Sequence, residues 1–301
     1  MTLIAGFRCY EGVVLCADQQ ETVGGVRVSV NKMKPELCGE YWLAIAGTGN
    51  GDLIDGFAYR LKLDLESWPE DLDNKGVYGR LQALVQQYHE NEVAFYPTDS
   101  ANNKLNHFLV CIKPKVRSEV FLWELRGTAI VSVGDYTLLG IDESIYRHEL
   151  KRLYQPNAFR QQVFFLAVHL FTLAKETSNY VGGSIDVIFI EDKGMGPLQP
   201  ETVRTLEDRM STVNGKIAEI LLACPDTGSV DDVELEGLLE NFREEILRLR
   251  QEARNIVLSG VTARTHVGTL IPSITIGSQQ KEEDQSVDSQ ESEEKDKGDE
   301  S

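Results

Sequence analysis

The sequence lacks the features that would indicate a membrane protein, an exported protein or a metalloprotein. None of its 301 residues belongs to an apolar run approaching the ~18 residues of a transmembrane helix. Its start lacks the basic segment and apolar core of a secretory signal peptide. Five histidines are scattered, and no two lie at the spacing of metal ligands. We therefore expect no membrane span, no secretory leader and no metal.

Cysteine and positive charge are also scarce. The five cysteines are an odd number without metal-binding spacing, so we expect reduced, mostly buried thiols in a cytoplasmic protein. Lys and Arg number 30 against 48 Asp and Glu, which gives a net charge of −18. Such a surface repels phosphate groups, so we expect neither nucleic acid nor an anionic membrane as a partner.

Hydrophobic periodicity predicts strands, then two helices, then strands, two helices and a strand. Apolar, β-favouring runs predict strands at 2–9, 12–17, 19–23, 26–30, 41–46, 108–113, 119–125, 129–133 and 185–190. Apolar residues at helical spacing predict helices at 53–65, 77–95, 140–154 and 159–176. This order indicates an α+β fold, a four-layer αββα sandwich of two antiparallel sheets between helix layers.

The character of the chain changes after residue 196. Residues 197–278 form a mainly helical C-terminal extension with helices at 201–223 and 231–257, and residues 257–276 favour short strands. The apolar stripe of the second helix packs either on the body or on a partner. Residues 279–301 carry ten acidic residues and three lysines, which predicts a disordered acidic tail. The expected domains are thus 1–196, 197–278 and 279–301.

Thr2 could act as a reactive N-terminal residue because it directly follows Met1. Removal of Met1 would leave a hydroxyl and a free α-amine on adjacent carbons. A threonine hydroxyl needs a base to act as a nucleophile. An α-amine has a pKa of about 7.7–8.0 and accepts a proton readily near neutral pH. Thr2 is therefore a candidate nucleophile that carries its own base.

Asp18 and Lys32 are candidates to support Thr2. The predicted strands bring Thr2, Asp18 and Lys32 toward one end of a sheet. An ammonium group beside the Thr2 amine would lower the pKa of that amine, and a carboxylate would hold the lysine. Each residue alone has a simpler interpretation, a turn aspartate or a surface lysine. Lys34 is a competing choice for the lysine.

The glycine-rich segment 47–51 follows a predicted strand and precedes a helix. Helix N-termini bind anions, which raises the question of a phosphate cradle. The segment lacks the Gly-Lys-Ser/Thr ending of a P-loop. Two interpretations remain: a tight strand-to-helix turn, and a set of backbone N–H donors for an oxyanion.

Four segments together resemble the proteasome β-subunit family of N-terminal nucleophile hydrolases, including its bacterial relatives. They are TLIAGF at 2–7, GVVLCAD at 12–18, NKM at 31–33 and AIAG at 44–47. The resemblance covers residues 2–190 and is strongest before residue 61. It implies two packed sheets between helix layers, assembly into rings, and peptide hydrolysis through an acyl-enzyme intermediate.

The resemblance also implies roles for individual residues. Thr2 would supply the nucleophilic oxygen and the basic amine, Lys32 would tune the site, and Asp18 would orient Lys32. The backbone N–H of Gly47 would stabilise the oxyanion. No metal or other cofactor is implied.

Substrate contacts are implied at Glu21, Ile45 and Gly49. Ile45 would line the specificity pocket and favour apolar side chains, whereas Glu21 adds a nearby negative charge. The substrate would be a peptide or an unfolded protein. The chain contains no ATPase motif, so any unfolding motor would be a separate protein.

Positions that support the amine in the family carry other residues here. An aspartate and a serine align with Ser178 and Val181, and a further serine aligns with Val133. This leaves three hypotheses. The first is a cytoplasmic threonine endopeptidase in a homo-oligomeric ring, and the second is a catalytically silent scaffold that recruits a partner. The third is an amidase of the same superfamily that acts on a small amide.

Overall fold

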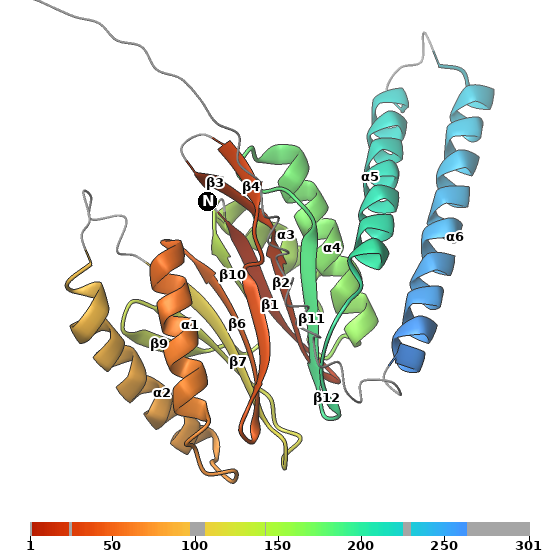
Figure 1. Cartoon of the computed structure of the whole chain (residues 1–301). Coiled ribbons are helices and arrows are strands. Elements are labelled where there is room, and N and C mark those ends of the chain that lie inside the picture. The colour runs from red at the N-terminus through yellow and green to blue at the C-terminus, as the bar shows by residue number, and fades with distance from the viewer. Residues whose placement is uncertain (1, 24–25, 97–105, 142, 225–229, 264–301) are drawn as a thin grey trace, which may run out of the picture.

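The computed structural model describes residues 2–23, 26–96, 106–141, 143–224 and 230–263. The fold is α+β, with helices beside antiparallel sheets (Figure 1). Met1, the turn expected at 24–25 and the acidic tail expected at 279–301 lie outside the described residues. Within them, no helix combines the length and the apolar composition that a membrane crossing requires.

The first five-stranded sheet places the N-terminal strand inside the sheet, away from its edges. Its order is β10-β1-β2-β11-β12. The strands are β1 (Leu3–Cys9), β2 (Gly12–Asp18), β10 (Tyr136–Gly140), β11 (Ile185–Glu191) and β12 (Gly194–Pro197). Because β1 pairs on both sides, the backbone that follows Thr2 is fixed by two ladders.

The second five-stranded sheet has the order β5-β6-β7-β8-β9. Its strands are β5 (Met33–Cys38), β6 (Tyr41–Thr48), β7 (His107–Pro114), β8 (Phe121–Arg126) and β9 (Ala129–Ser132). A separate two-stranded sheet joins β3 (Gln20–Val23) to β4 (Val26–Ser29). It connects the end of β2 to the segment that enters β5.

The sheets and helices pack on one another through three hydrophobic clusters. One contains residues of both five-stranded sheets, including Ile4, Leu15, Ala44 and Leu109. A second joins the first sheet to α3 (Glu143–Leu153) and α4 (Arg160–Thr177). The third joins the second sheet to α1 (Gly51–Leu65) and α2 (Asn74–Tyr88), which continues as η1 (His89–Val93). Alternating side chains of the central strands β1, β2, β6 and β7 thus belong to two different clusters.

Local sequence explains where the helices of the second sheet begin. The Asn50 side chain accepts a hydrogen bond from Leu53 N at 3.2 Å and caps α1. Asp73 caps α2 in the same way through Gly76 N at 2.8 Å. Such caps satisfy backbone N–H groups that have no partner within the helix.

The C-terminal helices form an antiparallel pair beside α4 (Figure 1). They are α5 (Pro200–Ala223) and α6 (Asp232–Ala263). Leu249 of α6 belongs to the cluster of the first sheet and its helices, and Phe242 packs against that cluster, whereas Leu239 and Leu247 remain exposed. The apolar stripe of α6 therefore packs partly on the rest of the fold.

Some predictions about secondary structure were wrong. Strands β5, β10 and β12 were not predicted, and residues 257–263 are helical where strands were expected. Pro35 obscured β5, because proline is tolerated in a strand mainly at a sheet edge, and β5 is such an edge. The rest of the strands expected at 257–276 lies outside the described residues.

Candidate active site

Thr2 and Asp18 come together at one end of the first sheet. Ile4 pairs with Ala17, so the residue before β1 and the last residue of β2 lie at the same end of the ladder. The Thr2 residue is 9% exposed and the Asp18 residue 0%. Strand alternation places Thr2 on the same face as Ile4, which points into the cluster between the sheets.

Asp18 connects this end of the sheet to three other segments. Its Oδ1 accepts hydrogen bonds from Leu3 N and Lys32 Nζ, both at 2.9 Å. Its Oδ2 accepts from Gln20 N at 3.2 Å and from Gly182 N at 3.4 Å. Four donors to one carboxylate offset the cost of burying its charge. Because Leu3 N and Lys32 Nζ share one oxygen, they lie within about 6 Å of each other.

Lys32 is held in a buried ion pair. Its Nζ also donates to the backbone oxygen of Gln20. Burial lowers the pKa of Lys32, and the Asp18 carboxylate acts in the opposite direction. By contrast, Lys34 forms an exposed pair with Asp55 at 2.6 Å. Of the two lysines considered, Lys32 is the one that contacts Asp18.

Gly47 lies close to Lys32 through the register of the second sheet. Met33 pairs with Ala46, so the next residue of β6, Gly47, lies beside the position of Lys32. A Cβ atom at Gly47 would approach the Ile54 side chain to 2.7 Å. Glycine at this position therefore also permits close packing of α1 on the sheet.

The residues expected to contact substrate lie around the start of α1. Oε1 of Glu21 lies 3.8 Å from the position that a Cβ of Gly51 would occupy. Gly49 has a φ of +129°, which favours glycine in the turn that leads into α1. The Ile45 side chain is 2% exposed and packs in the cluster beneath α1 and α2.

One predicted supporting position was wrong, and another lies beside the site. The Val133 oxygen accepts a hydrogen bond from Arg8 Nε at 2.6 Å, near the opposite end of β1 from Thr2. Ser178 lies in the segment that approaches Asp18 through Gly182, and its Oγ accepts from Tyr180 N at 3.3 Å.

Gly140 and Ile141 lie beside Thr2, and sequence reasoning missed both. Ile141 N donates to the Thr2 oxygen at 3.0 Å. Gly140 has a φ of +118°, and a Cβ there would lie 1.8 Å from the Thr2 oxygen. A glycine between a strand and a helix was the only local signal, and it did not reveal the partner.

We expect Gly140→Ala to displace the backbone at Thr2. The left-handed φ alone costs about 1–3 kcal/mol for a residue with a Cβ, and the contact with the Thr2 oxygen adds to it. Thermal unfolding of the variant measures the loss. Gly134→Ala is the matched control, because nothing lies within 4 Å of its Cβ position. Equal melting temperatures for the two variants would contradict the close approach at Thr2.

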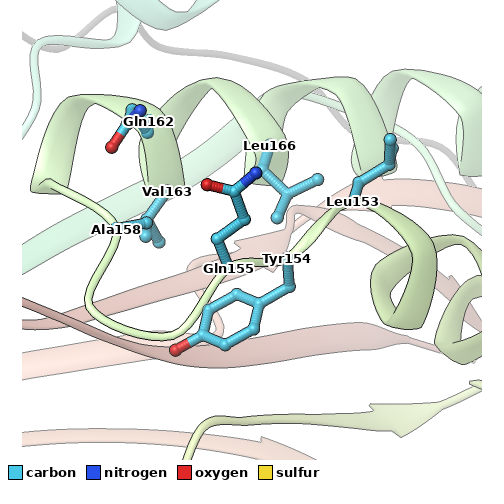
Figure 2. A pocket seen from close by; sticks show the side chains of 7 residues that line it. All are labelled: Leu153, Tyr154, Gln155, Ala158, Gln162, Val163 and Leu166. Carbon is cyan, nitrogen blue, oxygen red and sulfur yellow. The ribbon is translucent and has the colours of Figure 1, made fainter.

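Two cavities in the structure lie away from Thr2. A cavity of about 150 Å³ is bordered by Tyr154, Gln155 and Gln162, between the end of α3 and the start of α4 (Figure 2). A wider one of about 700 Å³ lies at the β1–β2 turn and includes Arg8 and Arg160. Among the described residues, no group of three or more His, Cys, Asp or Glu is arranged to hold a metal ion.

Comparisons with known proteins identify the fold. A scan against models of protein families found no match, and neither did a search of curated proteins. Among solved structures, Anbu (ancestral beta-subunit) from Yersinia bercovieri matches with a TM-score of 0.58 and 14% identity, covering 72% of this chain and 97% of that chain. The helical assembly of the Anbu complex from Pseudomonas aeruginosa matches with a TM-score of 0.59 and 14% identity, covering 72% and 96%.

The Gly-1 mutant of Anbu from Hyphomicrobium sp. strain MC1 matches with a TM-score of 0.57 and 15% identity, covering 73% of this chain and 97% of that chain. Identities this low support similarity of fold. One of these structures is described as an ancestral beta-subunit. The chain therefore has the same fold as these Anbu structures.

Proposed function

We propose that this protein is a threonine-type endopeptidase of the proteasome β-subunit-like class, with Thr2 as its N-terminal nucleophile after removal of Met1. The observation that carries the proposal is the shared Asp18 oxygen, which binds both Leu3 N and Lys32 Nζ at 2.9 Å. It couples the residue after the nucleophile to the buried ammonium group. The fold shared with Anbu supports the same assignment.

The proposed reaction uses groups of this chain alone. The α-amine of Thr2 takes the proton from its own hydroxyl as Oγ1 attacks the peptide carbonyl. The Lys32 ammonium favours the neutral, basic form of that amine, and Asp18 orients Lys32. The backbone N–H of Gly47 stabilises the oxyanion. The carbonyl then re-forms as the amine returns the proton to the leaving nitrogen, and water hydrolyses the resulting ester.

We also propose the substrate contacts and the architecture that accompany this function. Glu21, Ile45 and Gly49 contact the peptide substrate. The two five-stranded sheets lie between helix pairs in a four-layer αββα sandwich within residues 1–196. Residues 197–278 form the helical extension. The free cysteines fit a reducing cytoplasm.

A homo-oligomer follows from the same proposal. A structural neighbour from Pseudomonas aeruginosa is described as a helical assembly. We expect the full chain to elute as an oligomer, and light scattering coupled to gel filtration measures its mass. A monomer at micromolar concentration would contradict this part of the proposal. A discrete mass would indicate a closed ring, and a broad distribution an open assembly.

The function itself is tested by intact mass and covalent labelling. We expect a mass without Met1, and addition of the whole mass of a peptide epoxyketone, a reagent that reacts with both the hydroxyl and the amine. Retention of Met1 or acetylation of Thr2 would exclude this mechanism. A free Thr2 that neither reacts with the reagent nor cleaves peptides would favour the silent scaffold. Cleavage of small amides alone would favour the amidase.

A further inference from the structure

A second carboxylate, Asp186, lies near the Asp18–Lys32 pair. It belongs to β11, where Ile185 pairs with Asp18 and Asp186 pairs with Ala17. Alternation along β11 places Asp186 on the same face as Ile188, which belongs to the cluster between the sheets. The carboxylate therefore faces the space that the Lys32 side chain crosses from the other sheet to reach Asp18.

The two oxygens of Asp186 are in different situations. Oδ1 accepts a hydrogen bond from Gln19 Nε2 at 2.7 Å, and Gln19 is itself held through Ser29 Oγ at 3.2 Å. Oδ2 is buried and has no hydrogen-bond partner within the described part of the chain. Burial raises the pKa of Asp186, and the Gln19 hydrogen bond only partly opposes this. A partly buried carboxylate with one buried, unsatisfied oxygen is stabilised by a nearby positive charge.

Lys32 supplies the positive charge that favours the ionised form of Asp186. Asp186 and Glu21 both raise the pKa of Lys32 against the lowering effect of burial. The remaining titratable neighbours do not stabilise an ionised Asp186. Asp18 is another carboxylate, and the buried Cys16 thiol has its pKa raised in part by Asp186.

We propose that Asp186 is a positioning residue of the Thr2 site, whose negative charge acts on Lys32 across the space between the two sheets. The inference rests on the proposed function of Thr2. Asp18 binds Lys32 directly, and Asp186 adds a second negative charge without contact. Together they keep the ammonium protonated despite its burial, so that it can favour the basic form of the Thr2 amine.

A double-mutant cycle tests the interaction without requiring activity. Asp186→Asn keeps an acceptor for Gln19 and removes the charge. We expect it to raise the melting temperature more in a Lys32→Met background than in the wild type, because the carboxylate there has lost its counter-charge. Additive effects would overturn the proposal. If Lys32→Met does not fold, Lys32→Gln serves in the same cycle.

Proton linkage gives the sign of a second measurement. The folded-state pKa of Asp186 lies above the unfolded value of about 3.9, so stability falls as pH rises between the two values. Asp186→Asn lacks this fall. Its melting temperature relative to the wild type should therefore rise between pH 4 and pH 7. The exposed Asp192→Asn is the matched control. A constant difference would overturn the inference.

Labelling of Thr2 by the epoxyketone then connects Asp186 to the site. Without the charge of Asp186, Lys32 loses its proton at lower pH, so the alkaline limb of the rate profile should move to lower pH. An unchanged profile would overturn the role of Asp186 while leaving the proposed function intact. A wild-type Thr2 that does not react would instead overturn the proposed function, whereas coupling in the cycle would still support the Asp186–Lys32 interaction.

Discussion

Replacing Thr2 by alanine is expected to abolish covalent labelling and peptide hydrolysis, while the fold is retained. The proposal assigns the attacking oxygen to this side chain, and loss of a nucleophile reduces a rate by at least about a thousand-fold. Thr2→Ser should keep measurable labelling, because serine retains the hydroxyl beside the α-amine. Rates of adduct formation, followed by intact mass, measure both variants.

The same variants need a stability control. No hydrogen bond to the Thr2 hydroxyl is found in the described part of the chain, whereas the peptide group that joins Thr2 to Leu3 is bonded to both Asp18 and Ile141. We therefore expect Thr2→Ala to change stability by less than about 1 kcal/mol. Equal hydrolysis by wild type and Thr2→Ala would show that the activity comes from another group or from a contaminant.

Asp18→Asn is expected to cause the largest loss of stability among the site variants. The Asp18 carboxylate is fully buried, and each of its donors is a backbone N–H or the Lys32 ammonium. An asparagine amide would point its own N–H groups at some of these donors, and Lys32 would remain buried without its counter-charge. Breaking such a pair from one side costs about 3–5 kcal/mol.

Thermal unfolding measures this effect. A loss of 3 kcal/mol corresponds to a fall of about 6–12 °C for a chain of this size. Asp55→Asn, which breaks the exposed pair with Lys34, should change stability by less than about 1 kcal/mol. The double variant Asp18→Asn/Lys32→Met should recover part of the loss, because it removes the unpaired charge. A double variant as unstable as the sum of the two single changes would contradict this account.

Local pattern was enough to predict most helices and the central strands. Their apolar residues repeat with clear periods, as in α4, where Val163, Ala167 and Phe171 face the core. Edge strands were harder, because they are short and bury fewer side chains. In β5, charged Lys34 and Glu36 flank Pro35, and no apolar alternation is visible.

The candidate site was predictable only in part. Asp18 and Lys32 form an ion pair, and the catalytic roles assigned to them stay predictions. The contacts of Gly140 with Thr2 and of Gln19 with Asp186 join positions far apart in the sequence. No period, cap or turn signal encodes such pairs, because they depend on which strands become neighbours in the sheet. The alignment at Val133 failed for the same reason.

The pairing of β2 with β11 has a consequence for the order of events during synthesis. Gln19 and Asp186 are 167 residues apart, and Gly182 also reaches Asp18 from this late part of the chain. At about 5–20 residues per second, a ribosome needs about ten to thirty seconds to make that interval. Until then β2 lacks one neighbour, and Asp18 lacks one of its donors. The nascent chain therefore passes through a stage in which β1 and β2 have been synthesised but the site around Thr2 and Asp18 cannot yet form.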